Sequence, residues 1–242
     1  AGDEVCALLG GGGYAEKIAV PEGMVLPVPA GLSMAEAASL PEGFATAYLN
    51  LFLEAHMREG ETVFVQAGAS GLGLAAIQLA KAFGAKVMTS VGSPEKAEAV
   101  RRIGADWVLE RRRDDPAAAF EAHPVDIALD CVGGEVLGNC IERLAPGGRW
   151  ILISTLGGEF ARISLRPILK RGIRLIGSTL RSRPTEMKAR ILHELEEKVW
   201  PKFASKEIHP VIHAVLPVAR AEEAHAILQR NGNIGKVVLE IA

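Results

Sequence analysis

The sequence predicts an α/β fold built on a doubly wound parallel sheet. Between about residues 62 and 177, short apolar segments typical of strands alternate with segments that carry the apolar periodicity of helices. Most of these strand segments are apolar throughout instead of alternating, which is typical of a parallel sheet covered on both faces. Repetition of strand and helix also implies right-handed crossovers between parallel strands.

The composition fits a globular chain of one or two domains. The chain has 242 residues, with 27 Lys and Arg against 29 Asp and Glu, so its formal net charge is −2. This balance argues against nucleic acid or an anionic membrane surface as a partner. No apolar run reaches the roughly 18 residues of a membrane span, and three scattered cysteines make no disulfide framework. We therefore expect a cytoplasmic protein.

The first elements of the chain are short and extended. Segments 4–9 and 14–20 are predicted as strands, with a run of glycines as the turn between them. Prolines then break the following chain into short extended pieces. Because two strands alone are only marginally stable, we expect them to pair with the C-terminal end or with a segment that precedes Ala1.

The alternating part follows in order from there. Strand 62–67 leads to a helix over 72–83, whose apolar residues have helical spacing and which ends at Gly84. Ser93 and Asp115 each precede a proline, the pattern of a helix N-cap followed by proline at the first helical position. Further strands are expected at 86–91, 107–109, 125–129, 150–153 and 174–177, and further helices at 94–102, from 116, at 135–144 and at 165–170. A long helix to about 198, a strand at 211–215, a helix at 219–229 and a strand at 236–241 form a tail of different character.

The turn after strand 62–67 carries a chemical signature. Gly71, Gly73 and Ala76 fit the pattern G-x-G-x-x-A between a strand and a helix. The first Gly permits a tight turn, the second lets the backbone approach a pyrophosphate, and the small third residue lets helix and strand pack closely. Free N–H groups at the helix N-terminus face the phosphates. The pattern predicts a Rossmann-type dinucleotide site, with a simple tight turn as the alternative. A nucleophile elbow, G-x-S-x-G, is disfavoured because position 72 is Leu.

The end of the second strand indicates which dinucleotide binds. An acidic residue for the ribose 2′-hydroxyl is expected about 20 residues after the glycines, yet residues 90–93 read SVGS. Ser93 can donate to a phosphate and Lys96 adds a positive charge, which favours NADP. The negative charge of Glu95 argues against a phosphate here, although its position in the helix should turn the side chain outward. Arg111, the first of three arginines after the third strand, either reaches the adenosine or its phosphate, or belongs to a solvated basic turn.

Several motifs, in order along the chain, resemble those of one protein family. They are GDEV at 2–5, GGGYAE at 11–16, PVPAGLS at 27–33, QAGASG at 66–71, DCVGG at 130–134 and NIGKVVL at 233–239. On these motifs the chain resembles the quinone oxidoreductase (zeta-crystallin-like) branch of the zinc-independent medium-chain dehydrogenase/reductase superfamily. The resemblance implies an NADP-binding Rossmann domain at 41–178, flanked by the last strands of a GroES-like substrate domain at 1–40 and its C-terminal return at 179–242. It also implies that relatives extend further at the N-terminus, so that this substrate domain is incomplete and the chain is N-terminally truncated.

The resemblance also assigns cofactor-binding residues. The pyrophosphate contacts that it implies are Ser70, Gly71, Leu72 and Gly73, and the 2′-phosphate contacts are Gly92, Ser93 and Lys96, with Arg111 where relatives have Tyr. Cys131 is expected beside the adenosine. The residues expected around the nicotinamide end or as late contacts are Thr46, Thr155, Leu156, Asn233 and Lys236.

The same resemblance implies no metal site and names no catalytic residue. Relatives with zinc carry a four-cysteine lobe after the GDEV strand, whereas here that strand runs directly into glycines. The family places its active-site Tyr before the first residue of this chain. The implied reaction is hydride transfer from NADPH to a small-molecule quinone or activated enone. Two alternatives stay open: an enoyl-thioester reductase of the same superfamily, and a truncated form that binds NADPH without turnover. Relatives pair through the strand that corresponds to 174–178, so we also expect a homodimer.

Overall fold

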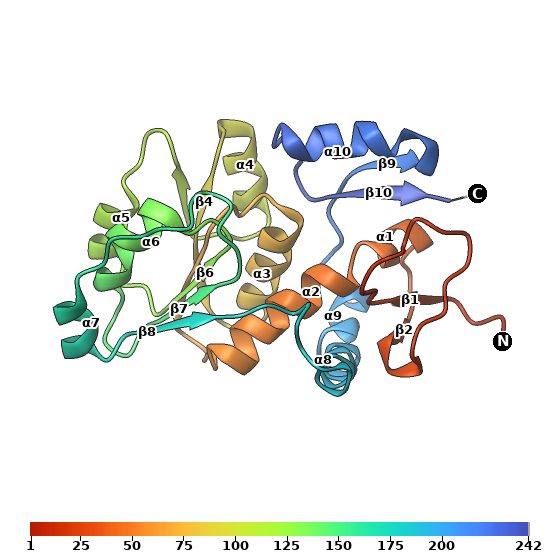
Figure 1. Cartoon of the computed structure of the whole chain (residues 1–242), viewed down its shortest axis with the longest axis horizontal. Coiled ribbons are helices and arrows are strands. Elements are labelled where there is room, and N and C mark those ends of the chain that lie inside the picture. The colour runs from red at the N-terminus through yellow and green to blue at the C-terminus, as the bar shows by residue number, and fades with distance from the viewer. Residues whose placement is uncertain (242) are drawn as a thin grey trace. The chain divides into compact units, whose positions relative to one another are not determined.

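Six parallel strands form the central sheet of the protein (Figure 1). In the computed structural model, which describes residues 1–241, their order is β5-β4-β3-β6-β7-β8. The strands are β3 (Thr62–Val65), β4 (Lys86–Val91), β5 (Trp107–Glu110), β6 (Ile127–Asp130), β7 (Arg149–Leu152) and β8 (Arg174–Gly177). This is the doubly wound order 3-2-1-4-5-6, and it confirms the predicted fold class. The order reverses between β3 and β6, and ligands of such sheets bind outside the carboxyl ends of the strands at this point.

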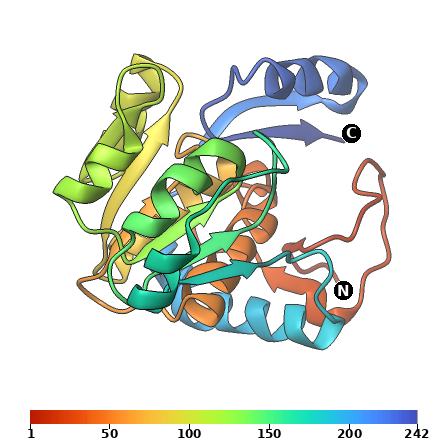
Figure 2. The ribbon, with the colours of Figure 1, turned by 60° about the vertical axis from the view of Figure 1, so that its left-hand side comes forward.

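Helices cover both faces of the sheet (Figures 1 and 2). They are α3 (Gly71–Ala82), α4 (Pro94–Arg102), α5 (Pro116–Ala122), α6 (Gly134–Cys140), the 3₁₀ turn η3 (Ile141–Arg143) and α7 (Leu165–Arg171). The predicted caps are present. The Ser93 side chain accepts from Lys96 N, the Asp115 side chain accepts from Ala117 N at 2.9 Å, and proline follows each cap.

The sheet and its helices belong to one of two units into which the chain divides. The sheet unit comprises residues 49–69 and 73–179, and the terminal unit comprises residues 1–48, 70–72 and 180–242. Phe64, Phe120 and Trp150 are buried together in the core of the sheet unit. Arg149 is buried beside this core, and its guanidinium donates to both carboxylate oxygens of Glu61 at 2.9 and 2.8 Å. It is an ion pair of fixed, bidentate geometry.

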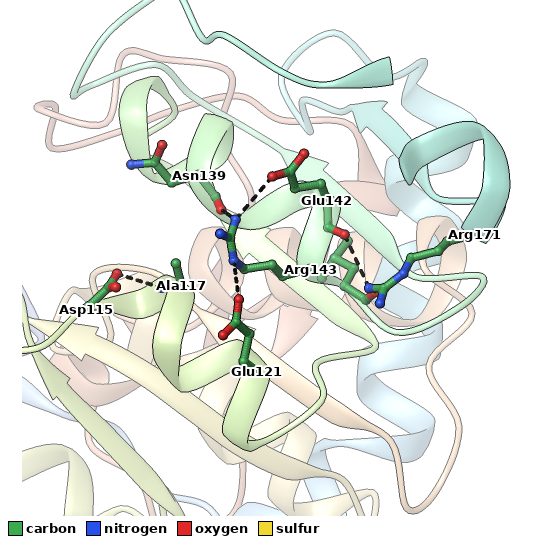
Figure 3. Close-up of polar contacts among 8 residues, drawn as sticks. Asp115, Ala117, Glu121, Asn139, Glu142, Arg143 and Arg171 are labelled. Carbon is green, nitrogen blue, oxygen red and sulfur yellow. Dashed lines mark hydrogen bonds and ion pairs between the residues drawn. The ribbon is translucent and has the colours of Figure 1, made fainter. Parts of the chain in front are cut away.

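Charged side chains link the helices on the outer side of that core (Figure 3). Arg143 donates to Glu121 at 3.0 Å, to Glu142 at 3.3 Å and to the carbonyl of Asn139. Arg171 donates to the carbonyl of Leu144 at 2.9 Å, so that α7 is tied to η3. The carboxylates beside Arg143 balance its charge, and we assign the cluster to helix packing.

The terminal unit contains two pairs of strands and several helices. β1 (Val5–Ala7) pairs antiparallel with β2 (Val25–Pro27), and β9 (Ile212–Pro217) pairs parallel with β10 (Lys236–Glu240). Its helical elements are η1 (Glu22–Met24), α1 (Met34–Ala38), α2 (Pro41–Tyr48), α8 (Thr185–Lys198), α9 (Trp200–Ala204), η4 (Val218–Arg220) and α10 (Ala221–Gln229). A π-helical segment, η2 (Leu49–Glu54), continues α2 into the sheet unit. No helix within residues 1–241 has the length and apolar character needed to cross a membrane.

The prediction of a strand at 14–20 was wrong. β1 pairs instead with β2, and residues 14–20 run as an irregular loop in which Tyr14 and Ile18 are 61% and 46% exposed. Alternation of side chains along a segment predicts a strand but does not choose its partner. Helices α1 and α2 were not predicted either. The Ser33 side chain caps α1 in a capping box with Glu36, a signal that was present in the sequence.

Two helices of the terminal unit are joined by a cluster of polar groups. Tyr48 at the end of α2 donates to Glu194 of α8 at 2.7 Å, and Lys198 and Arg190 donate to the same carboxylate at 2.8 and 2.9 Å. Hydrogen bonds and charge from Lys198, Tyr48 and Arg190 outweigh desolvation and lower the pKa of Glu194 to about 2. The carboxylate is therefore ionised at all ordinary pH values.

Candidate functional site

The glycine-rich turn brings helix α3 close to strand β3. A Cβ atom on Gly73 would lie 2.5 Å from the carbonyl oxygen of Ala67 and 2.7 Å from Cα of Gly68. Ala76, one turn further along α3, is fully buried. The sequence predicted this packing role for the small third residue and a close approach to the pyrophosphate for the second glycine. In the structure Gly73 also packs against the chain that follows β3. Ala67 has a φ of +56°, so the chain turns sharply between the strand and the helix.

Two buried polar atoms lie at the carboxyl ends of β3 and β4. Gln66 Oε1 and Ser90 Oγ have no hydrogen-bond partner among the described residues. Gln66 and Ser90 are only 3% and 2% exposed, so water does not reach them freely. Buried polar atoms are nearly always paired in folded proteins. Their position at the binding edge of the sheet fits a polar ligand that completes their hydrogen bonds.

Two cations meet where β4 and β5 end. Burial lowers the pKa of Lys96, because desolvation disfavours its charged form, and the positive charge of Arg111 lowers this pKa further. The guanidinium of Arg111 lies over Gly92, where a Cβ atom would come within 2.9 Å of Nη2. The structure thus brings together Gly92, Lys96 and Arg111, whose proximity the sequence alone did not establish. Like charges held side by side indicate a site for an anion.

Ser93 lies close to these two cations, and its hydroxyl already makes hydrogen bonds within the protein. Its hydroxyl oxygen accepts from Lys96 N at 3.4 Å, and a hydrogen bond from its side chain lowers the pKa of the exposed Glu95. A phosphate bound here would have to take this hydroxyl from Glu95. Among the predicted phosphate contacts, the two cations are therefore better placed than Ser93.

Loops after β6 and β7 form the next part of the edge. Asp130 is fully buried, and it accepts from Val132 N at 2.7 Å, from Gly133 N at 2.9 Å and from Trp150 Nε1 at 2.9 Å. Desolvation nevertheless raises the pKa of this carboxyl above its ordinary value. Gly157 N donates to the carbonyl of Val132 at 2.8 Å and ties the two loops together. As a result, the loop of Cys131 is joined to the loop that carries Thr155 and Leu156, both of them exposed at least in part.

All three cysteines are protonated thiols at neutral pH. Burial raises the pKa of Cys6 and of Cys131 to about 11, and that of Cys140 to about 12. Cys131 also contacts the carbonyl oxygen of Gln66 at 3.7 Å. It was predicted beside the adenosine, and its neutral thiol can supply an apolar wall there.

In the terminal unit, Lys236 crosses the first glycine of the motif. Gly235 forms a bridge with Ser70, and a Cβ atom on Gly71 would lie 2.6 Å from Cδ of Lys236. The Lys236 ammonium pairs with Glu42 at 3.0 Å, and Thr46 Oγ1 donates to the other oxygen of the same carboxylate at 3.0 Å.

These contacts bring together several predicted residues around one that was not predicted. The predicted residues are Thr46, Ser70, Gly71 and Lys236, with Asn233 close in the chain, where its side chain donates to the carbonyl of Gly235 at 2.7 Å. Glu42 was missed, although its place in the first turn of a helix that starts at Pro41 is a recognisable signal. Asp130 was missed as the organiser of the β6 loop.

The residues present fit a dinucleotide. Two cations stand at the ends of β4 and β5, unpaired polar atoms lie at the edge of the sheet, and Gly73 keeps the start of α3 close to β3. Within residues 1–241, no three His, Cys, Asp or Glu side chains cluster as a metal site would require.

Comparison with known proteins places these features in a family. A family model described as zinc-binding dehydrogenase matches residues 71–197. The chain is 30% identical over 245 residues to a quinone oxidoreductase-like protein 2 homolog of Nematostella vectensis, covering 98% of this chain and 67% of that protein. It is 32% identical over 247 residues to the quinone oxidoreductase of Rattus norvegicus, covering 98% and 72% respectively. The chain is also 31% identical to a lovastatin diketide synthase of Aspergillus terreus. The match covers the whole of this chain but only 10% of the synthase.

Solved structures give the same picture. The quinone oxidoreductase from Thermus thermophilus, solved also in its complex with NADPH, matches with a TM-score of 0.85 and 35% identity, over 97% of this chain and 75% of that one. The JamJ enoyl reductase matches with a TM-score of 0.78 and 30% identity, over 91% of this chain and 66% of that one.

Proposed function

The chain belongs to the quinone oxidoreductase branch of the medium-chain dehydrogenase/reductase superfamily, and on that premise we propose that it binds NADPH and reduces a quinone or an activated enone. The quinone oxidoreductases and the enoyl reductase named above are oxidoreductases by name, whereas the cofactor and the substrate class of this chain are our proposal. We also propose that the reaction needs no zinc, since the GDEV strand leads directly into Gly10–Gly13 where zinc enzymes of the superfamily insert their cysteine lobe.

The observation that carries the choice of NADPH is the pair of cations at Lys96 and Arg111. The positive charge of Arg111 disfavours the charged form of Lys96, and an anion beside the two side chains would offset this repulsion. The 2′-phosphate of NADPH is the group by which it differs from NADH, and a Rossmann fold holds that phosphate with basic residues after the second strand. No acidic side chain ends β4 to hold a free 2′-hydroxyl instead.

The remaining residues bind, orient and exclude water. The N-terminus of α3 presents backbone N–H groups to the pyrophosphate, and Gly73 keeps the helix close to the strand. The joined loops of Cys131 and Thr155 are proposed to line the adenosine and the nicotinamide. When bound, NADPH supplies a hydride, and the protein contributes position and a dry surrounding.

A cofactor-oxidation assay tests this function. NADPH absorbance would be followed with the chain and an ortho-quinone, with NADH as the control. Oxidation that prefers NADPH is expected. A preference for NADH would contradict the role of the two cations. Binding of NADPH without oxidation would favour the alternative of a cofactor-binding form without turnover.

A second candidate is an enoyl-thioester reductase of the same superfamily. It is favoured by similarity to a lovastatin diketide synthase and to the JamJ enoyl reductase. Parallel assays with an enoyl thioester and an ortho-quinone, at equal NADPH, separate the two candidates. Faster oxidation with the thioester would replace the quinone as the proposed substrate.

We further propose that two copies of the chain pair through β8. This strand ends the sheet among the described residues, and Leu175 on it is 46% exposed. Leu165 and Leu169 of α7 are 72% and 84% exposed. An apolar edge strand is a surface on which a second sheet can pair. Sedimentation at micromolar concentration should show a dimer in the wild type and a monomer after Leu175→Lys, while a monomeric wild type would refute the proposal.

A further inference from the structure

Gly71 leaves room for a side chain from elsewhere in the terminal unit. Its φ lies outside the left-handed region, so its backbone conformation is open to other residues. The space beside its Cα is filled by the stem of Lys236, whose Cδ, Cε and Cγ atoms would lie 2.6, 2.8 and 3.0 Å from an added Cβ. Lys236 therefore runs across the first residue of α3, beside the backbone that is proposed to hold the pyrophosphate.

The far end of Lys236 is held by Glu42. The ammonium lies 3.0 Å from Glu42 Oε2, and Thr46 holds Oε1 at 3.0 Å, so both oxygens of the carboxylate are used. Glu42 lies in the first turn of α2, where a negative charge is favourable. Burial raises the pKa of this carboxyl, but the charge of Lys236 and the hydrogen bonds from Lys236 and Thr46 outweigh it, so the net pKa is lowered. The Glu42 side chain is 61% exposed, and its carboxylate is ionised at neutral pH and held by hydrogen bonds from Lys236 and Thr46.

We propose that Glu42 is a positioning residue that holds the Lys236 side chain across the glycine-rich turn, with its ammonium in readiness for the pyrophosphate of NADPH. The inference rests on the proposed function, because it requires that the turn binds a dinucleotide. A lysine has a long flexible stem, and ordering it only when the ligand arrives would weaken binding. Held by Glu42 across Gly71, the stem is ordered in advance.

Positioning and simple electrostatics predict opposite results when Glu42 loses its charge. A carboxylate near a phosphate repels it, so its removal alone would tighten NADPH binding. If the carboxylate instead orders Lys236, its removal weakens binding, because the ammonium is released from the turn. The sign of the change therefore distinguishes the two roles.

The experiment is a calorimetric titration of NADPH into wild type, E42Q, K236M and the double variant. A matched control is E207Q, because Glu207 pairs with Lys202 at 2.7 Å elsewhere in the terminal unit. We expect the Kd of E42Q to rise about fivefold, that of K236M to rise at least as much, and the double variant to match K236M. E207Q should bind as wild type does. The lack of additivity is the sign that Glu42 acts through Lys236.

Other outcomes overturn the inference. Unchanged or tighter binding by E42Q, or an effect of E42Q that adds fully to that of K236M, would refute it while leaving the proposed function intact. Failure of the wild type to bind NADPH would refute both. Thermal denaturation of each variant checks folding. If E42Q does not fold, T46V keeps the carboxylate but loosens it, and its Kd should also rise, by less than fivefold. An unchanged Kd would refute the inference.

Discussion

Replacing Lys96 by Gln should weaken binding of NADPH and leave binding of NADH unchanged. Lys96 is half-buried, and it stands beside Arg111 at the carboxyl ends of β4 and β5. Only NADPH carries the phosphate that these cations are proposed to meet. The same substitution removes the repulsion between the two side chains, so the ligand-free protein should become more stable. A gain in stability with a loss of affinity is typical of a charged binding site.

The size of the effect follows from the exposure of Lys96. A hydrogen bond to a charged group contributes about 1.5–3 kcal/mol. Since part of the Lys96 side chain remains in water, the lower end of this range applies, and about 1.4 kcal/mol corresponds to a tenfold change in Kd. The Kd for NADPH should therefore rise about tenfold in K96Q. Because Arg111 is proposed to meet the same phosphate, the double variant K96Q/R111Q should lose more affinity for NADPH than either single variant.

Fluorescence titration with both nucleotides measures the effect. Lys86, exposed at the amino end of β4, provides the matched control K86Q, which should bind both nucleotides as wild type does. An equal rise in Kd for NADPH and NADH would show that Lys96 supports the fold of the site and does not recognise the 2′-phosphate. A tenfold loss of NADPH affinity in K86Q would show that the effect is one of net charge.

Three further substitutions test other parts of the fold. R149M removes one partner of a buried ion pair and leaves Glu61 uncompensated, so the free energy of unfolding in urea should fall by about 3–5 kcal/mol; a loss below about 1 kcal/mol would contradict this. G73A forces α3 away from β3, which should lower stability by about 1–3 kcal/mol and abolish NADPH binding, and wild-type binding would show that the turn adapts. The pKa of Glu194 is lowered in the folded state from an ordinary 4.5 to about 2, so its stabilisation is complete above pH 4.5 and is lost as pH falls toward 2. The Tm of wild type should accordingly fall more steeply over that range than the Tm of E194Q, and parallel curves would rule out this role for Glu194.

The alternating part of the chain was predictable because local and long-range signals agree there. The strands of the sheet are short and mostly apolar, and helices α4 and α5 begin at the predicted caps. The first sixty residues were less predictable. Polar and apolar residues alternate along segment 14–20 as they do in a strand, but β1 pairs with β2 instead. The choice of partner depends on tertiary contacts that the alternation of side chains does not determine.

The candidate site was predictable to a similar extent. The glycine turn, Lys96 and Arg111 could be named because the motif fixes their place relative to the strands. The contact of Lys236 with Glu42 could not be predicted from the sequence, because the two residues are 194 positions apart and only the fold brings them together. The repulsion between Lys96 and Arg111 was likewise invisible, since it depends on how the ends of β4 and β5 lie side by side.

The burial of the cysteines has a consequence for the proposed reaction with quinones. Quinones are electrophiles that arylate thiolates, and the thiolate is the reactive form of cysteine. With the pKa of Cys6 and Cys131 at about 11 and that of Cys140 at about 12, the fraction of thiolate at neutral pH is negligible. The thiols of the folded protein should therefore resist arylation by the proposed substrate. Mass spectrometry after incubation with a reactive quinone should find the native chain unmodified, and the unfolded chain arylated on its thiols.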